Sequence, residues 1–237
     1  MKIRSSTLAI TAAFVAILGA ASAAQAQYSD LRITEAMSSS GSGGTVDWFE
    51  LTNYGLTMAS ISGWTMDDGS FAFGSSLALN GVASIGAGES VLFLESADGA
   101  DIASFRAFWG GIDSVQIGYY SGSGVGLSSS GDGVVVFDSG GVEQTPRVQF
   151  GAATAGSSFY YAYDSAGNPT TSPNLAAVLS TVGTLDGQVT YASANALGNI
   201  GSPGTAANAP IPEPATGMLL GVGALWACRR IRRRAAL

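Results

Sequence analysis

Short runs of apolar and β-branched residues alternate with Gly, Ser and Asp from about residue 28 to residue 208. Runs of this length between turn residues are typical of β-strands, because a pleated strand accommodates branched and aromatic side chains well. Two runs, 91–94 (VLFL) and 134–137 (VVVF), are apolar without a break, which predicts inner strands covered on both faces. The expected strands are residues 31–36, 48–53, 61–66, 90–95, 114–120, 133–138, 147–150 and 159–163.

Helical periodicity is weak in this part of the chain. Only residues 102–109 and 174–182 are predicted to form short helices. Turns between the strands are predicted where glycine allows a positive φ and Asp closes local hydrogen bonds. These turns are Asp68-Gly69, Asp98-Gly99, Asp132-Gly133, Gly140-Gly141 and Asp186-Gly187. Seven or more short strands with this turn spacing predict an all-β domain built as a two-sheet β-sandwich.

The first 26 residues differ from this pattern and are predicted to be a secretory signal peptide. Lys2 and Arg4 form its charged start, and residues 8–21 form its apolar segment. Ala24 and Ala26 occupy the two small-residue positions of the cleavage site, so Gln27 is the expected mature N-terminus. The alternative, an N-terminal helix packed on the domain, is disfavoured because the segment has no amphipathic period.

The C-terminal end has three parts in a fixed order. Pro212-Glu213-Pro214 comes first, then the apolar run 215–228, then a basic cluster at 229–234. A helix over the apolar run would be about 21 Å long, against a hydrocarbon core of about 30 Å, so it is marginal as a permanent span. Residues 206–211 are predicted to be a linker between domain and tail. The cluster that would stay on the cytoplasmic side consists of Arg229, Arg230, Arg232, Arg233 and Arg234.

Charge is distributed unevenly along the chain. The formal net charge is −7, but the two termini hold seven of the ten basic residues. Between Gln27 and Asn208 three arginines stand against sixteen carboxylates, so the domain carries about −13. Nucleic-acid affinity comes largely from Lys and Arg contacts to phosphates. The composition therefore argues against a nucleic-acid partner and disfavours unassisted binding to anionic lipid.

The chain lacks several of the usual catalytic groups. It contains no histidine, which removes the commonest general base, the commonest zinc ligand and any Ser-His-Asp triad. Its lysine at position 2 would be lost with the signal peptide, and its one cysteine, Cys228, lies in the apolar tail. The domain therefore has neither a Schiff-base lysine nor a disulfide, and its stability must come from packing. These absences predict a protein that is not an enzyme.

Carboxylates are the remaining candidates for chemistry. Glu35, Asp47 and Glu50 fall in or beside predicted strands, so they have a chance to converge. A convergent pair would suit acid and base roles in glycoside cleavage or would help to hold a cation. With sixteen carboxylates in the domain, a structural role in bonding backbone donors is the favoured interpretation.

The Asp-Gly turns also suggest calcium, which prefers several carboxylate and carbonyl oxygens. The best local candidates are Asp67 and Asp68 in one turn and Asp98 and Asp101 in another. Neither segment fits the twelve-residue EF-hand loop or repeats as a nonapeptide array. Hairpin turn chemistry is therefore the expected explanation, with no bound cofactor, and calcium stays a weaker alternative.

The C-terminal arrangement resembles the PEP-CTERM sorting signal. Pro212, Glu213 and Pro214 match its motif, and the arginines from Arg229 onward match its basic end, so residues 212–237 are interpreted as the complete signal. The resemblance implies recognition by an exosortase, a membrane-embedded enzyme that removes the tail during delivery to the cell surface. Before processing, the apolar helix would hold the chain in the membrane. A plain single-pass anchor, transient or permanent, is the alternative.

The domain itself, residues 27–205, resembles a lamin tail domain. Segments 31–36 (LRITEA), 47–53 (DWFELTN) and 61–67 (ISGWTMD) are similar to its opening strands, and 202–205 (SPGT) to its closing turn. The pattern departs at Thr34, where the family has Asn, and in a long insertion over about 150–200. The resemblance implies an immunoglobulin-like β-sandwich without enzymatic activity. Its signature residues here are Glu35, Asp47, Trp48, Glu50, Gly63 and Trp64.

Together these observations predict an exported structural or adhesive protein of the cell surface or exopolysaccharide matrix. Its expected partners are an exosortase and, beyond it, exopolysaccharide or other surface proteins. An extracellular calcium- or carbohydrate-binding module is the second hypothesis, motivated by acidic loops and aromatic residues. An extracellular hydrolase that uses a carboxylate pair is the third.

Overall fold

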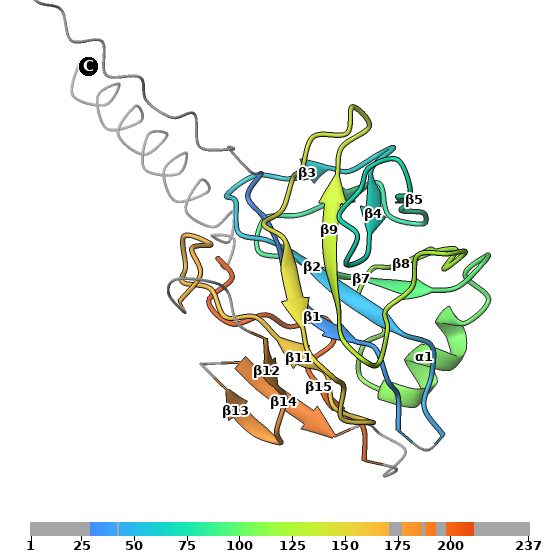
Figure 1. Cartoon of the computed structure of the whole chain (residues 1–237). Helices are drawn as coiled ribbons and strands as arrows, with labels where there is room; N and C mark the ends of the chain where they lie inside the picture. Colours follow the sequence, from blue (N-terminus) through green and yellow to red (C-terminus); the bar gives the residue numbers. More distant parts are fainter. Residues whose placement is uncertain (1–28, 42, 171–176, 186–187, 193–197, 211–237) are drawn as a thin grey trace, which may run out of the picture.

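The computed structural model describes residues 29–41, 43–170, 177–185, 188–192 and 198–210, and most of its elements are strands (Figure 1). The larger sheet has six strands and the smaller has four. In spatial order the larger consists of β12 (Val178–Leu179), β11 (Phe159–Tyr160), β1 (Leu31–Met37), β2 (Trp48–Asn53), β7 (Ser90–Glu95) and β8 (Ile117–Tyr120). The smaller consists of β10 (Val148–Phe150), β9 (Asp132–Phe137), β4 (Thr65–Asp67) and β5 (Leu77–Ala78).

Short additional strands complete the described part of the chain. β3 (Ala59–Ser60) pairs with β6 (Ser84–Ile85), and β14 (Gln188–Ala192) pairs with both β13 (Gly183–Leu185) and β15 (Ile200–Gly201). One helix, α1 (Ile102–Trp109), connects β7 to β8. These two strands are parallel, and parallel neighbours need a crossover connection, which α1 supplies.

A β-bulge in β1 determines which side chains meet on the larger sheet. β1 and β2 are antiparallel, with Ile33 opposite Leu51 and Glu35 opposite Glu50, so Thr34 is the extra residue. Strict alternation would place Glu35 on the same face as Ile33, in the core. The bulge instead moves Glu35 to the opposite face and returns Ala36 to the core.

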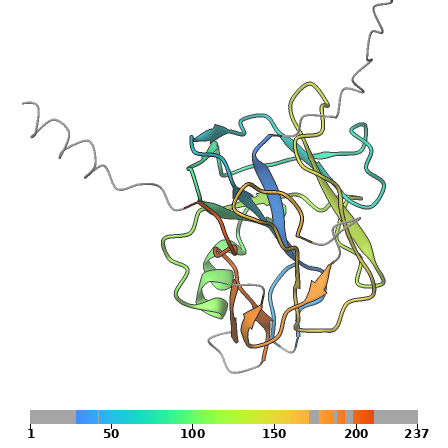
Figure 2. The same cartoon turned by 90° about the vertical axis from the view of Figure 1, so that its left-hand side faces the viewer.

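Apolar side chains cover both faces of the larger sheet, which lies between α1 and the smaller sheet (Figure 2). On one face Phe49 stacks on Phe93 at 5.4 Å between ring centroids, and the cluster extends to Val134 and Val136 of the smaller sheet. On the other face Trp48 meets α1, with T-shaped contacts to Phe105 and Trp109. Burial of this apolar surface is the main source of stability in a domain whose described part holds no cysteine.

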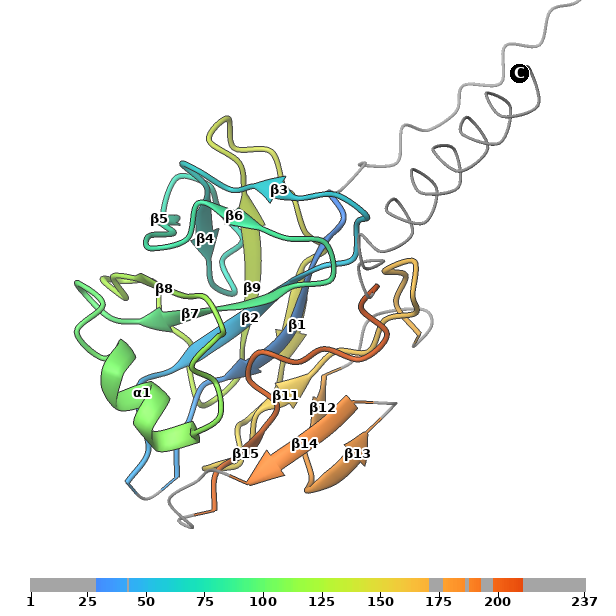
Figure 3. The ribbon, with the colours of Figure 1, turned by 180° about the vertical axis from the view of Figure 1, so that it is seen from behind.

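The remaining area of the α1 face is covered by residues 198–205, which we call the closing segment. It contains β15 and the Ser202-Pro203-Gly204-Thr205 turn, and Figure 3 shows it passing beside α1 over β1 and β11. Ile200 exchanges backbone hydrogen bonds with the β10–β11 connection, donating to Gly156 and accepting from Ser158. Beneath this segment the sheet carries polar rather than apolar side chains.

The predicted all-β sandwich is confirmed, and the helix predicted at 102–109 has the same bounds as α1. Strands β2 and β7 also begin and end where predicted. The uninterrupted apolar runs 91–94 and 134–137 are buried and lie in strands with a neighbour on each side, as expected.

Other predictions of local structure were wrong. The helix expected at 174–182 is replaced at Val178–Leu179 by β12, which pairs with β11. The strand expected from residue 61 begins only at Thr65, because Ile61 accepts a turn hydrogen bond from the Trp64 N–H. Asp132, expected in a turn, is the first residue of β9, so this strand begins one residue before its predicted start at Gly133. The two-residue strands β3, β5 and β6 had no signal in the apolar pattern.

The predicted signal peptide, the Pro-Glu-Pro motif, the apolar run 215–228 and the arginine cluster all lie outside the described residues. Within the described ranges, the structure contains no helix with the length and apolar character needed to cross a membrane.

Candidate functional site

The centre of the site is the pair Glu35 and Glu50. The two residues are opposite each other on β1 and β2, and neither side chain is exposed to solvent. The bulge at Thr34 places both on the face that the closing segment covers. Glu35 and Glu50 therefore converge, a possibility that the predicted strands left open for these carboxylates.

Donors from distant segments bind all four carboxylate oxygens. Glu35 accepts hydrogen bonds from the Ser158 hydroxyl, from the Ser202 N–H at 2.9 Å and from the Ser202 hydroxyl at 2.7 Å. Glu50 accepts from the Thr34 hydroxyl at 2.5 Å and from the Gly204 N–H at 2.6 Å. The pair thus ties the closing segment to the middle of the larger sheet across more than 150 residues of sequence.

Burial dominates the electrostatics of the pair. It raises the pKa of Glu35 to about 7, against the opposing effect of the Ser158 and Ser202 hydrogen bonds. It raises the pKa of Glu50 to about 8, and the nearby Glu35 charge acts in the same direction. Both shifts follow from the cost of placing a charge in a medium of low dielectric constant. The described residues bring no Lys or Arg side chain to either carboxylate.

Asp47, the third suspected carboxylate, lies elsewhere. It precedes Trp48, and its carbonyl accepts the Glu95 N–H at 2.8 Å. Burial raises its pKa to about 7, with the Glu95 charge as a second cause. Strand alternation places Asp47 on the face opposite Trp48 and Glu50. The structure therefore separates Asp47 from the pair.

The remaining signature residues are structural. Trp48 and Phe49 anchor the two faces of the sheet, and the Trp48 indole N–H has no partner in the described residues. Gly63 adopts φ +77° in the turn before Trp64. A Cβ added at Gly63 would have Ser139 Cβ 3.6 Å away, which is an ordinary contact distance. The positive φ is the reason for glycine at this position.

The four acidic turn residues bind their own loops. Asp67 is buried and accepts three hydrogen bonds, from Ser70, Ala72 and Ser75, which hold the loop 68–76 in place. The others close local contacts: Asp68 accepts the Ser70 N–H, Asp98 the Ala100 N–H and Asp101 the Ser96 hydroxyl. Among the described residues no three His, Cys, Asp or Glu side chains converge as a metal site would require.

These contacts give a prediction about calcium. Because these carboxylates bind donors of their own loops, millimolar calcium is expected to leave the melting temperature of the mature protein unchanged within about 1 °C. A bound calcium ion would instead raise the melting temperature by mass action. Replacing Asp67 by Ala is expected to destabilise the domain by about 1–3 kcal/mol, since three donors lose their acceptor. Thermal melts with calcium and with chelator test the first expectation, and denaturant titration tests the second. A calcium-dependent rise that Asp67→Ala abolishes would contradict the turn interpretation.

Several partners of the pair were not identified from the sequence. Residues 202–205 were noted as a closing turn, but nothing indicated that Ser202 and Gly204 would bind carboxylates. Ser158 carries no local signal, because it lies in a Gly/Ser/Ala-rich connection of ordinary composition. Only the sheet register and the return of the chain over β1 bring these groups together.

The fold and the site define a β-sandwich module whose central carboxylates are closed under its own chain. The chain belongs to the lamin tail domain family: the profile of that family, Lamin Tail Domain, matches residues 24–152, more than half of the chain. The match covers β1 to β10, whereas β11 and the closing segment follow it. Searches of the curated proteins and of the solved structures each gave no match.

A second profile, the PEP-CTERM protein-sorting motif, matches residues 210–234. The chain is therefore a secreted, envelope-associated protein that an exosortase processes. This match includes Pro212, Glu213, Pro214 and the arginines Arg229, Arg230, Arg232, Arg233 and Arg234.

Proposed function

We propose that this protein is a non-enzymatic structural or adhesive component of the cell surface or its exopolysaccharide matrix. The observation that carries the proposal is the closure of the Glu35–Glu50 pair. Both carboxylates are fully buried, and their oxygens are occupied by donors from the closing segment and neighbouring strands. A catalytic acid or base must come within hydrogen-bond reach of a substrate. This pair instead acts as an internal tie.

The composition supports the same conclusion. No histidine is present in the chain, and the domain contains no lysine or cysteine for nucleophilic chemistry. The hydrolase hypothesis rested on Glu35 and Glu50, and a carboxylate pair for glycoside cleavage needs an open space for the sugar and, in inverting enzymes, a water. A passive scaffold needs only the packing and the ties that the sandwich has.

Contacts between the folded domain and the predicted linker extend almost to the sorting motif. Ala207, within the predicted linker, is buried, and its carbonyl accepts the Tyr54 hydroxyl at 2.6 Å. Asn208 donates to the Tyr163 carbonyl at 2.9 Å. Folded contacts thus extend to within four residues of Pro212. We infer that the exosortase acts near the folded surface of the sandwich and releases a compact domain.

Intact-mass measurement tests this sorting route. Protein collected from the cell surface is expected to lack residues 229–237, because exosortase processing removes the tail. Replacing Glu213 by Ala should retain the tail and keep the protein in the membrane fraction, whereas Glu143→Ala, at a partly exposed residue distant in sequence from the motif, should be processed normally. Surface protein that still carries the arginine cluster would contradict the proposed route.

A further inference from the structure

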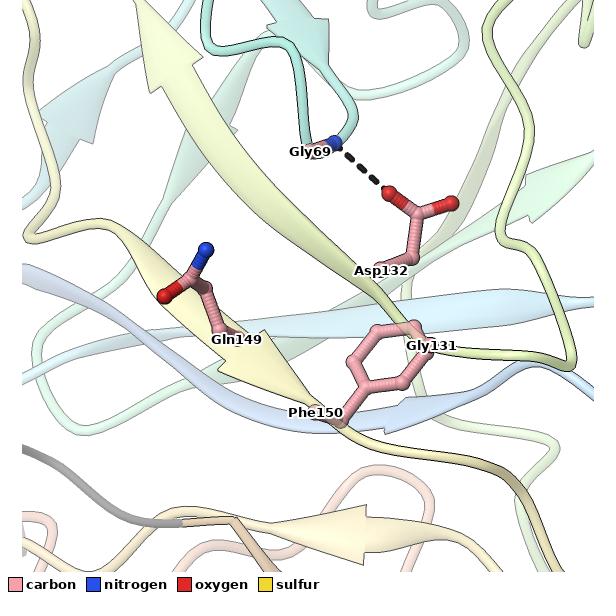
Figure 4. Close-up of a pocket in the computed structure, with 5 residues that line it drawn as sticks. All are labelled: Gly69, Gly131, Asp132, Gln149 and Phe150. Atoms are coloured by element: carbon pink, nitrogen blue, oxygen red, sulfur yellow. Dashed lines mark hydrogen bonds between the residues drawn. The ribbon is translucent and has the colours of Figure 1, made fainter.

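An open pocket lies at one end of the smaller sheet (Figure 4), and its lining includes neither Glu35 nor Glu50. Its volume is about 430 Å³. Three segments form it: the loop after β4, the start of β9 and the end of β10. The lining residues are Gly69, Gly131, Asp132, Gln149 and Phe150.

Asp132 makes the pocket rigid. Its Oδ1 accepts the Gly69 N–H at 2.7 Å and the Gly133 N–H at 2.8 Å, and its Oδ2 accepts the Ser128 N–H at 2.7 Å. One carboxylate therefore joins the loop 68–76 to the loop that precedes β9. Because a carboxylate offers about four acceptor positions, one remains for a hydroxyl group from outside.

Gln149 supplies an amide without a partner among the described residues. It is exposed on β10, and its cross-strand neighbour is Gly133, which has no side chain to contact it. Figure 4 shows the Gln149 amide and the Asp132 carboxylate, which come from neighbouring strands and both line the pocket. An amide both donates and accepts hydrogen bonds, so the two groups together offer both functions to one ligand.

An aromatic ring borders this polar pair. Phe71 adopts φ +50°, unusual for a residue with a side chain, and its Cζ lies 2.5 Å from where a Cβ on Gly133 would be. The glycine thus makes room for the ring over β9. The Arg147 guanidinium carbon lies 5.0 Å from the ring centroid, and Arg147 also forms an ion pair with Glu143. A non-glycine residue with a positive φ, such as Phe71, is strained and persists where the surrounding structure requires that conformation.

The chemistry of these groups selects a class of ligand. A fixed carboxylate and a domain charge of about −13 disfavour polyanions. A pocket with an amide, a carboxylate oxygen and an adjacent ring matches a sugar ring, which has hydroxyls at its edge and C–H groups on its faces. We propose that this pocket binds an uncharged polysaccharide strand through Gln149 and Asp132. This inference rests on the proposed surface function and names its partner.

Affinity electrophoresis of the processed surface protein tests the proposal. Gels contain dextran, galactomannan or hydroxyethylcellulose as uncharged probes, or alginate as a polyanion. At least one uncharged polymer is expected to retard the protein, and Gln149→Ala should weaken this retardation about tenfold through lost hydrogen bonds. Leu56→Ala, at a side chain 85% exposed on another loop, is the matched control and should migrate like the parent. Gln149→Ala should fold normally because its exposed side chain makes no hydrogen bond within the described residues.

Three results would overturn the assignment: no retardation by any uncharged polymer, equal retardation of Gln149→Ala and parent, or stronger retardation by alginate. The amount of protein at the cell surface is measured in parallel, so that failure of the polysaccharide site can be distinguished from failure of the proposed function. A parent protein that is sorted and processed but never retarded overturns only the polysaccharide site. A parent protein that does not reach the surface overturns the proposed function.

Discussion

Replacing Glu35 by Ala is expected to lower the free energy of unfolding by about 3–5 kcal/mol. The substitution leaves the Ser202 N–H, the Ser202 hydroxyl and the Ser158 hydroxyl without their acceptor in a buried site. Each buried donor that loses its partner costs about 1–3 kcal/mol, and the removed side chain also leaves a cavity. Denaturant titration of the processed protein measures the loss.

Glu143→Ala is the control for this substitution. Glu143 is also a glutamate of the sandwich, but its ion pair with Arg147 is solvent-exposed, so its loss is expected to cost less than about 1 kcal/mol. If Glu35→Ala lost no more stability than Glu143→Ala, the pair could not be the tie that holds the closing segment.

The stability of the domain is expected to fall as the pH rises from about 5 to 8. Burial raises the pKa of Glu35 to about 7 and that of Glu50 to about 8, from an ordinary value of 4.5. The folded state therefore binds more protons than the unfolded state in this window, and the stabilisation present below pH 4.5 is lost as each carboxyl ionises. At about 1.4 kcal/mol per pKa unit the loss is on the order of 3 kcal/mol for Glu35 alone. Unfolding titrations at a series of pH values measure it.

Glu50→Gln separates this effect from the rest of the domain. Glutamine keeps the size of the side chain but does not titrate, so the decline should be much shallower, above all between pH 7 and 8 where Glu50 ionises. Asp47, whose pKa burial also raises to about 7, is present in both proteins and affects both curves alike. A pH profile identical for parent and Glu50→Gln would show that the pair does not control acid–base stability.

The two predictions concern a site that the sequence revealed only in part. The pattern at 47–53 (DWFELTN) identified β2 and the alternation of its side chains correctly. The sequence of β1 did not reveal that Glu35 reaches the same face as Glu50, because nothing in it indicates the bulge at Thr34. Asp47, grouped with them by its position in the sequence, lies beside Glu95 instead.

The accuracy of the fold prediction followed the length of the apolar runs. The six-residue runs of β2 and β7 give strong period-two or fully apolar signals, and α1 has the helical spacing of Phe105, Phe108 and Trp109. Two-residue strands such as β3 and β6 are held by their partner across the sheet rather than by their own composition. Val178 and Leu179 show the same effect, since pairing with β11 outweighs the local preference that suggested a helix.

Apolar periodicity, composition and terminal motifs are local properties, so they were enough to predict an all-β, cysteine-free, acidic domain followed by a sorting motif. The role of the carboxylates depends instead on how the folded chain brings distant segments together. Glu35 and Glu50 become a buried tie because one extra residue rotates β1 and because Ser202 and Gly204, more than 150 positions away, return over the sheet. Burial and long-range donors are what raise the pKa values of this pair, and both arise only when the chain has folded.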